Sequence, residues 1–402
     1  MKSPAARFGL LLALLLLAGR FFPSTGLTNA ADETRPDRLY LEKPLLYVLL
    51  SPPLEILDNL TFLSRNQHVV LAGSLAALTL AFLFLRYRRR WARVLLGMCF
   101  FWTLYAWALI LCAFLPRPMA ALRSADPDDL VVDFHSHTSA SRDGLPWFDP
   151  ETSRRWHTRA GFHAVYITDH DIVNAAFRAK ALNPARAGDG LVFLPGEELS
   201  LYKLHLVVIG NTDWIDPEPH CDSPGQVFAL LRQLAARKNV LAIASLPEYN
   251  DYSWASVPGF VAAGIHGFEM ATGAPQSLDF PRDRRSVVVD FARRRGLFLT
   301  AATDTHGYGS ASLAWTVVHL PGWRSLPSGR LDEAIRERLV SGGVQGAIPV
   351  VRDTAYPADS WKTPGILPAF VWGTVRSLNW GEWVVWMAAT GLWVFYRRRR
   401  MR

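Results

Sequence analysis

Cysteine is scarce in this 402-residue chain, which contains only three. Cys99 and Cys112 lie within an apolar stretch and Cys221 stands alone in the more polar part, so no disulfide is expected within a folded domain. The same scarcity argues against a closed structural zinc site built from thiolates. The sequence also lacks low-complexity tracts and repeats of solenoid period. The cellular compartment therefore has to be inferred from topology.

An excess of positive charge is also missing outside two short clusters. The net charge is +8, but the arginines at 86–93 and 397–402 exceed that total by themselves. Both clusters flank apolar stretches instead of covering a folded face, so they indicate membrane topology and not a nucleic-acid interface. No nucleic acid is expected as a partner.

What the chain has in quantity is apolar sequence, since 50% of its residues are hydrophobic. Residues 69–85 and 94–115 are uncharged and about as long as a ~30 Å hydrocarbon layer requires, which predicts two transmembrane helices. Residues 380–396, rich in tryptophan and followed by arginines, predict a further transmembrane helix. Residues 1–31 contain a shorter apolar run, which fits either a signal peptide or a first transmembrane anchor.

The arginine clusters set the expected orientation, because short arginine-rich loops stay in the cytoplasm. Residues 86–93 are then a cytoplasmic loop and residues 397–402 a cytoplasmic tail of an integral protein of the plasma or inner membrane. A domain at 125–365 and a segment at 32–68 lie outside, in the periplasm or the extracellular space. Within that segment, apolar residues at 45–63 have helical spacing, which fits an interfacial helix or one packed on the spans.

From residue 130 onward, short apolar runs alternate with longer amphipathic stretches, as is typical of β/α units around a parallel sheet or barrel. Seven strand candidates favour a barrel-like α/β domain, in which polar residues that follow successive strands gather at one end. The expected strands are 130–134, 164–167, 191–194, 204–209, 240–244, 267–270 and 297–301, with helices at 224–237 and 282–295.

Almost every expected strand is followed by histidine or an acid. His135 and His137 stand in DFHSHT, where alternation along an extended segment puts both imidazoles on one side, within reach of one metal. Asp143, TDHD with His170, PGEELS with Glu197 and Glu198, His205, and TDTHG with Asp304 and His306 follow in chain order.

Each of these elements alone also fits polar caps and turn residues at strand ends, and His205 alone fits a packed core histidine. Together they predict a metal centre of imidazole and carboxylate ligands, suited to zinc, manganese or iron. The donors outnumber the needs of one ion, which predicts two or three bridged divalent metals. Such a centre favours hydrolysis by a metal-activated water.

The strings DFHSHT, TDHD, PGEELS and TDTHG, in this order and at these separations, resemble the PHP family, the polymerase and histidinol phosphatase domain. The resemblance covers roughly residues 131–316. It implies a distorted (β/α)7 barrel, a centre of two or three metals at the carboxyl ends of the strands, and phosphoester hydrolysis with manganese, iron or zinc. It also implies metal-ligand roles for His135, His137, Asp143, His170, Glu198, His205, Asp304 and His306.

Two features depart from the family pattern. Asp143 comes one residue late, because Arg142 is inserted before it. Leu246 stands where the family usually has a His-Pro pair, and leucine cannot bind a metal. One ion is therefore absent or weakly held, unless Glu248 or Asn250 substitutes. Arg142 is a candidate contact for a substrate phosphate, with a solvated surface arginine as the alternative.

These observations predict a membrane-anchored metal-dependent phosphoesterase that acts on a phosphorylated substrate associated with the membrane or envelope. No separate general acid is evident. Two alternatives stay open. An amidohydrolase-like enzyme also begins with H-x-H after a first strand, but it gives no reason for His306 beside Asp304. A non-catalytic sensor or scaffold that binds metal or phosphate would accommodate Leu246.

Overall fold

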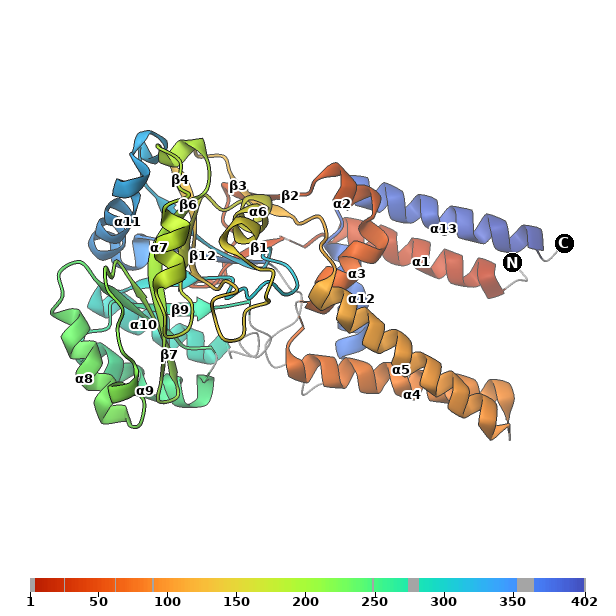
Figure 1. Cartoon of the computed structure of the whole chain (residues 1–402). Helices are drawn as coiled ribbons and strands as arrows, with labels where there is room; N and C mark the ends of the chain where they lie inside the picture. The colour runs from red at the N-terminus through yellow and green to blue at the C-terminus, as the bar shows by residue number, and fades with distance from the viewer. Residues whose placement is uncertain are drawn as a thin grey trace. The chain divides into compact units, whose positions relative to one another are not determined.

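The computed structural model describes residues 4–400 except 25, 62, 89, 248, 274–281 and 353–364. It divides into two compact units (Figure 1). Unit 1 comprises Met1–Gly26, Lys43–Pro118 and Asp353–Arg402, and unit 2 comprises Leu27–Glu42 and Met119–Arg352. The segment predicted at 32–68 is therefore divided between the two units.

Unit 1 consists of helices with largely apolar surfaces. Among the described residues, α4 and α5 are long and apolar enough to cross a membrane, and only 11% and 6% of their most apolar windows are buried. The predicted span at 69–85 falls within α4, and that at 94–115 matches α5 except for Leu115, which caps the helix. The helices are α1 (Pro4–Phe21), α2 (Leu45–Leu49), α3 (Ser51–Thr61), α4 (Arg65–Tyr87), α5 (Trp91–Phe114), α12 (Ile366–Arg376) and α13 (Trp380–Arg400).

Helices α1 and α13 pack against each other inside unit 1. The ring of Phe8 meets that of Trp393 at 5.6 Å between centroids, and Trp383 Nε1 donates a hydrogen bond to the Leu16 carbonyl at 3.1 Å. The apolar stretch at 45–63 forms α2 and α3, and α3 buries several of its residues, including Leu54 and Leu60. The packed helix is thus the alternative that the structure favours for this stretch.

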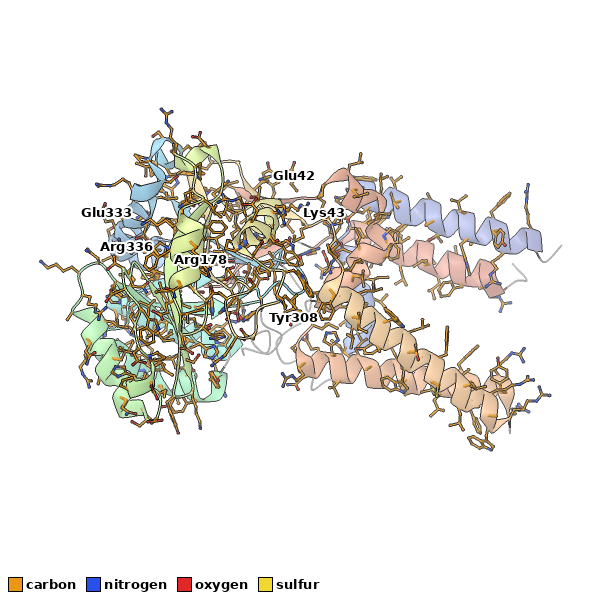
Figure 2. The ribbon with its side chains drawn as sticks, viewed as in Figure 1. Glu42, Lys43, Arg178, Tyr308, Glu333 and Arg336 are labelled. Atoms are coloured by element: carbon orange, nitrogen blue, oxygen red, sulfur yellow. The ribbon has the colours of Figure 1, made fainter. Side chains whose placement is uncertain are left out.

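A buried ionic cluster joins helices of unit 1. Lys43, which is labelled in Figure 2, takes part in it. Its Nζ lies 2.7 Å from Glu382 Oε2 and 3.3 Å from Glu55 Oε2. Arg117 Nε lies 2.8 Å from Asp58 Oδ1, and the Tyr47 hydroxyl lies 2.8 Å from Glu55 and 2.7 Å from Asp58. Because the charges of both signs are present within the cluster, the cost of burying each is offset by a partner.

Unit 2 contains a curled sheet of ten strands in the order β1-β12-β11-β4-β5-β6-β7-β8-β9-β10 and a separate pair, β2-β3. The far end of the sheet returns to β11, because the Thr316 hydroxyl bonds both the amide and the carbonyl of Ala301. Each of the seven expected strands is present. The strands are β1 (Leu27–Asn29), β2 (Leu39–Glu42), β3 (Ala121–Ser124), β4 (Asp129–Ser136), β5 (Ala164–Ile167), β6 (Val192–Leu201), β7 (Leu204–Ile209), β8 (Leu241–Ser245), β9 (Gly267–Ala271), β10 (Phe298–Ala301), β11 (Ala314–His319) and β12 (Ile348–Arg352).

The expected α/β class is confirmed, but the strands do not all run in one direction. Pairs β4-β5, β5-β6, β8-β9 and β9-β10 are parallel, whereas β7 runs antiparallel to both β6 and β8. The reason lies in the tight turn after Leu201, where Lys203 adopts a left-handed φ of 48° and leaves no room for a crossover helix. The (β/α)7 count stays a prediction.

Helices cover both faces of the curled sheet, and alternation along each strand sorts the side chains between them. On β7, Leu206 and Val208 pack in the cluster that includes α8 and α10, whereas Val207 and Ile209 pack in the cluster that includes α11. The helices of unit 2 are α6 (Pro150–Ala160), α7 (Asn174–Lys180), α8 (Pro224–Ala235), α9 (Asn250–Ala262), α10 (Arg282–Arg295) and α11 (Ser328–Gly342).

Two histidines secure the starts of parallel strands in the same way. His163 precedes β5 and accepts the amide hydrogen of Val131 through Nδ1 at 3.0 Å, and His266 precedes β9 and accepts that of Ala242 at 3.1 Å. Burial lowers the pKa of both imidazoles, that of His163 to about 4 with help from nearby arginines. Both rings therefore remain neutral acceptors near neutral pH.

Candidate metal centre

The eight predicted ligands meet at one edge of the curled sheet. The parallel strands contribute from or just beyond their carboxyl ends, since His135 lies near the end of β4 and Asp304 follows β10. The antiparallel strand β7 contributes from its beginning, where His205 is its second residue. Within the described residues, ligand atoms of His135, His137 and Glu198 lie within 4.8 Å of one another, as do two further groups that share members with this one.

Glu198 is the centre of the arrangement. Its Oε2 lies 3.1 Å from His135 Nε2, from His137 Nε2 and from His170 Nδ1, and its Oε1 lies 2.8 Å from His205 Nδ1. Four imidazoles from three parts of the sheet edge thus converge on one fully buried carboxylate.

Asp304 and Asp143 flank this core on two sides. Asp304 Oδ1 lies 3.2 Å from His137 Nε2 and 3.5 Å from His135 Nε2. Asp143 is half exposed and bridges His170 Nε2 at 3.3 Å and His306 Nε2 at 3.2 Å. The ring of His306 stacks on that of His137, with centroids 3.9 Å apart.

The electrostatics of the cluster are strongly coupled. Burial alone would raise the pKa of Glu198, but the imidazoles of His135 and His205 hold it well below its usual range. Burial likewise opposes protonation of His137, yet the close carboxylates of Asp304 and Glu198 raise its pKa to about 9. The carboxylates of Glu198, Asp304 and Asp143, whose pKa values are all lowered, therefore stay ionised and favour a positive charge in their midst, whether from protons or from a metal ion.

The donor set fits divalent metal ions. Neither oxygen of Glu198 accepts a well-directed hydrogen bond among the described residues, although both are buried. The Nε2 atoms of His135 and His137 face each other at 3.1 Å. Metal–nitrogen bonds of about 2.0–2.1 Å hold neighbouring ligand atoms roughly 3.0–3.4 Å apart, so the side chains already have the spacing of ligands around a common ion.

Nearby acids that were not predicted as ligands have structural roles. Asp133 accepts hydrogen bonds from the amide of Thr303 and lies 3.0 Å from His157 Nε2, which ties β4 to the segment after β10. Asp169 accepts from the amide and hydroxyl of Thr138. Glu197 points to the other face of β6, where burial raises its pKa to about 8 and the Ile215 amide donates to it.

The residues that depart from the family pattern lie as follows. Leu246 is fully buried in an apolar cluster with residues of α8 and α9. Glu248 lies outside the described residues, and the side chain of Asn250 is not described. Arg142 is largely exposed at the rim, where it donates to Ser200 Oγ at 3.0 Å and lies 3.6 Å from Asp171. Ser200 in turn lies 3.3 Å from His170 Nδ1, so Arg142 is near the cluster.

Glu269 is the member of this region that the sequence argument missed. It lies in β9, is fully buried, and its carboxylate approaches His135 Nδ1 at 3.2 and 3.3 Å. The available signal was an acid inside an otherwise apolar strand, since a buried carboxylate needs a partner.

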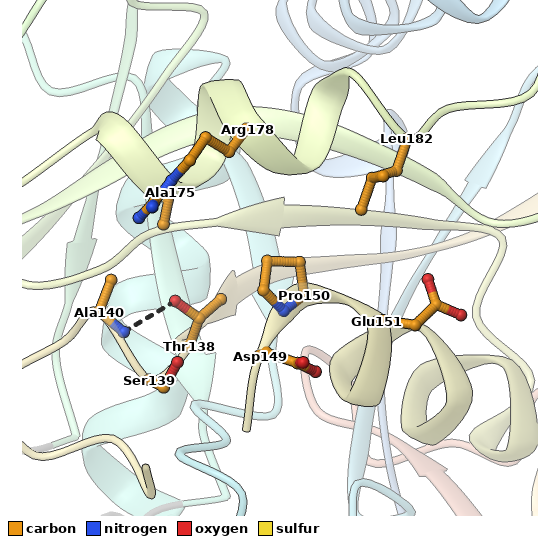
Figure 3. A pocket seen from close by; sticks show the side chains of 9 residues that line it. All are labelled: Thr138, Ser139, Ala140, Asp149, Pro150, Glu151, Ala175, Arg178 and Leu182. Carbon is orange, nitrogen blue, oxygen red and sulfur yellow. Dashed lines mark hydrogen bonds between the residues drawn. The ribbon is translucent and has the colours of Figure 1, made fainter. Parts of the chain in front are cut away.

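A pocket of about 400 Å³ adjoins the segment that follows His137 (Figure 3). In Figure 3, Thr138 Oγ1 accepts the hydrogen bond of the Ala140 amide, which holds the pocket wall formed by this segment. The lining offers groups of both charges, Arg178 and the carboxylates Asp149 and Glu151. The lining residues are Thr138, Ser139, Ala140, Asp149, Pro150, Glu151, Ala175, Arg178 and Leu182.

No family model and no curated protein matches the sequence. Among solved structures, a two-domain protein from Bacteroides vulgatus containing a predicted PHP-like metal-dependent phosphoesterase is 18% identical, with a TM-score of 0.36, and the match covers 56% of this chain and 65% of that one. A putative metal-dependent phosphoesterase from Bifidobacterium adolescentis is 19% identical, with a TM-score of 0.33 and coverage of 53% and 96%.

An amidohydrolase from Chromobacterium violaceum is 20% identical, with a TM-score of 0.31 and coverage of 50% and 96%. The chain thus spans about two thirds of the first of these proteins. Structural neighbours of the chain include both phosphoesterases and an amidohydrolase, and likenesses at this level do not choose between them. The function is therefore inferred from the cluster itself.

Proposed function

We propose that the protein is a membrane-anchored, metal-dependent phosphoesterase of the PHP type. The observation that carries the proposal is the convergence of four imidazoles on the buried carboxylate of Glu198. A site with this many convergent nitrogen and oxygen donors suits two or three divalent ions, manganese, iron or zinc. Bound there, the ions would supply an activated water and neutralise charge on the phosphoryl oxygens.

Different side chains would bind the metal ions and the phosphate ester. Glu198 lies between the His135 and His205 sides of the cluster, so its two oxygens would help to hold metal on either side. Asp143 and His306 are the more exposed donors and lie where a substrate phosphate would enter. Arg142, held by Ser200 at the same rim, is placed to meet a phosphate oxygen.

Hydrolysis at this centre is balanced without a further reactant. Water forms a new bond to phosphorus, the ester P–O bond breaks, and the leaving oxygen takes up a proton as the alcohol. The proton that the leaving oxygen takes up comes from the attacking water.

The membrane part of the proposal rests on unit 1. Helices α4 and α5 have the length and apolar composition of spans and expose most of that apolar surface. The packing of α13 on α1 supports a retained first anchor and a last span. With the arginine clusters in the cytoplasm, unit 2 faces the periplasm or the exterior, and its substrate is a phosphate ester at the membrane or envelope.

Activity is tested with the full chain purified in detergent and stripped of metal. Manganese, iron or zinc is added back, and phosphate mono- and diesters are assayed beside amide substrates. Turnover of an ester with added metal, lost in His135→Ala/His137→Ala and kept in His220→Ala, supports the proposal. His220 is a matched control because it is a histidine of unit 2 outside the cluster.

Other results of this assay would replace the proposal. Turnover of amides alone would favour the hypothesis of an amidohydrolase-like enzyme. Stoichiometric metal binding without turnover of either class would favour a sensor or scaffold. The orientation is tested separately with topology reporters fused after Arg402 and after residue 120, and a cytoplasmic signal from the second fusion would contradict it.

A further inference from the structure

A buried carboxylate stands behind one of the proposed ligands. Glu269 lies in the middle of β9, and its two oxygens lie 3.3 and 3.2 Å from His135 Nδ1. The partner strand β8 places Ser245 directly beside it in the parallel register. Both side chains are almost completely buried, so no solvent competes for these bonds.

The two nitrogens of His135 face different surroundings. Nε2 points into the cluster, 3.1 Å from Glu198 and 3.1 Å from His137 Nε2, whereas Nδ1 points to Glu269. A neutral imidazole that donates from Nδ1 to a carboxylate has its lone pair on Nε2, which is the nitrogen that a metal needs. The contact with Glu269 thus selects the tautomer that turns a ligand atom toward the cluster.

Glu269 is itself held in place from the neighbouring strand. Ser245 Oγ donates to Glu269 Oε1 at 2.6 Å, and the amide of Leu246 donates to the Glu269 carbonyl at 3.4 Å. Leu246 turns its own side chain into the apolar core. Among the described side chains at the end of β8, Leu246 therefore supplies no ligand, and the contribution of Ser245 is to fix the carboxylate that orients His135.

Among the described contacts of Glu269, no lysine or arginine neutralises its charge. An isolated buried carboxylate is costly, and one that only stabilised the strand pair could be replaced by an apolar residue. A carboxylate that raises the basicity of a metal-binding imidazole has a reason to be there, because its charge is useful when a cation is bound to the other nitrogen.

We infer that Glu269 is a positioning residue: with Ser245 it fixes the tautomer and orientation of His135 and thereby increases metal affinity without touching the metal. The inference rests on the proposed metal site, and its test measures metal binding instead of turnover. Partners of this kind change metal affinity by about 10- to 100-fold.

The test compares the full chain with Glu269→Gln. Zinc and manganese affinities are measured by competition with a chromophoric chelator, and thermal unfolding is followed in the metal-free state. We expect the metal affinity of Glu269→Gln to be about 10- to 100-fold weaker than that of the wild type. Ser245→Ala should lose less affinity in the same direction, and it replaces Glu269→Gln in the test if that variant fails to fold. Nitrogen-15 shifts of His135 should move from the Nδ1–H tautomer toward a mixture.

A double-mutant comparison separates this role from general stabilisation. In a His135→Ala background, Glu269→Gln should cause no further loss of affinity, because the residue acts through that ring. An equal loss in both backgrounds, or a lower metal-free unfolding temperature with unchanged affinity, would overturn the inference. If the wild-type chain binds neither metal, both the proposed function and the inference about Glu269 are wrong. If the wild type binds metal and Glu269→Gln binds it equally well, only the inferred role of Glu269 is wrong.

Discussion

The protein buries two clusters of ionisable side chains, one in each unit, and they are built from opposite chemistry. In unit 1, Lys43 and Arg117 lie among Glu55, Asp58 and Glu382, with the closest pairs at 2.7 and 2.8 Å. In unit 2, the cluster around Glu198 contains imidazoles and carboxylates and, among the described side chains, no buried lysine or arginine. Glu198 is as deeply buried as the acids of the unit 1 cluster, so burial alone does not mark a functional site.

What separates the clusters is whether they bring their own cations. In the unit 1 cluster, Lys43 and Arg117 supply two cations beside three carboxylates, so most of its negative charge is neutralised by the chain itself. Imidazoles are different, since they offer either a proton or a lone pair. The cluster in unit 2 is completed by protons or by metal ions, and its many lone pairs favour metal.

The largest effect is expected from removing the carboxylate on which the imidazoles converge. Glu198→Gln deletes the charge shared by four histidines, and metal-dependent turnover should fall by at least about 10⁴-fold, the scale seen when an essential charged member of a catalytic unit is removed. Metal content and steady-state turnover of the full chain measure this. Glu55→Gln, which changes a buried acid of unit 1 in the same way, should leave both within a few-fold of the wild type.

Breaking the other cluster should affect stability and leave metal binding intact. Arg117→Ala strands Asp58, whose carboxylate it contacts at 2.8 Å, and leaving a buried charge without its partner costs about 3–5 kcal/mol. Unit-resolved hydrogen exchange in detergent should report this loss in the peptides of unit 1. Reduced metal affinity in the same variant would show that the two clusters are not independent.

Adding metal should stabilise unit 2 and leave the stability of unit 1 unchanged. A ligand at 100 times its dissociation constant stabilises the state that binds it by about 2.7 kcal/mol. Hydrogen exchange of unit 2 should slow on addition of zinc or manganese, and that of α3 and α12 in unit 1 should not change. The slowing should disappear in Glu198→Gln, whereas slowing of unit 1 alone would place the metal elsewhere.

The contrast also explains how much could be read from the sequence. His135, His137 and His306 were found because short motifs keep their donors near strand ends, and the seven expected strands were found because their apolar runs are short and evenly spaced. Strand direction was not visible in the sequence. Only the structure shows that the turn at Lys203 is too short to hold a crossover helix and therefore makes β7 antiparallel. The roles of the ligands stay predictions.

The residues whose roles were not predicted from the sequence contact partners that are distant in the chain. Glu269 meets His135 across 134 residues, and Lys43 meets Glu382 across 339. No periodicity relates such pairs, because their distance is set by the packing of whole strands and helices. A buried acid within an apolar strand is a signal that some partner exists, but its identity requires the fold.

The smallest expected effect is an acid-dependent loss of stability that belongs to unit 2. The pKa of His163 is lowered from 6.5 to about 4, chiefly by burial and further by Arg324 and Arg123. Its Nδ1 accepts the Val131 amide hydrogen only while it is unprotonated. The unfolded chain binds the proton more readily, so the stabilisation is complete above pH 6.5 and is lost as the pH falls toward 4. Since the ring is not fully buried, we expect about 1–2 kcal/mol over this range.

His163→Gln keeps a hydrogen-bond acceptor and removes the titration, so its free energy of unfolding should depend less on pH between 6.5 and 4 than that of the wild type. Metal-free protein is used, because protons and metal ions also compete at the cluster. His266→Gln should act in the same direction through the matching bond to Ala242. If the wild type and both variants lose stability equally as the pH falls, the acid sensitivity of unit 2 comes from the carboxylates around Glu198. His163 and His266 then make no measurable contribution to it.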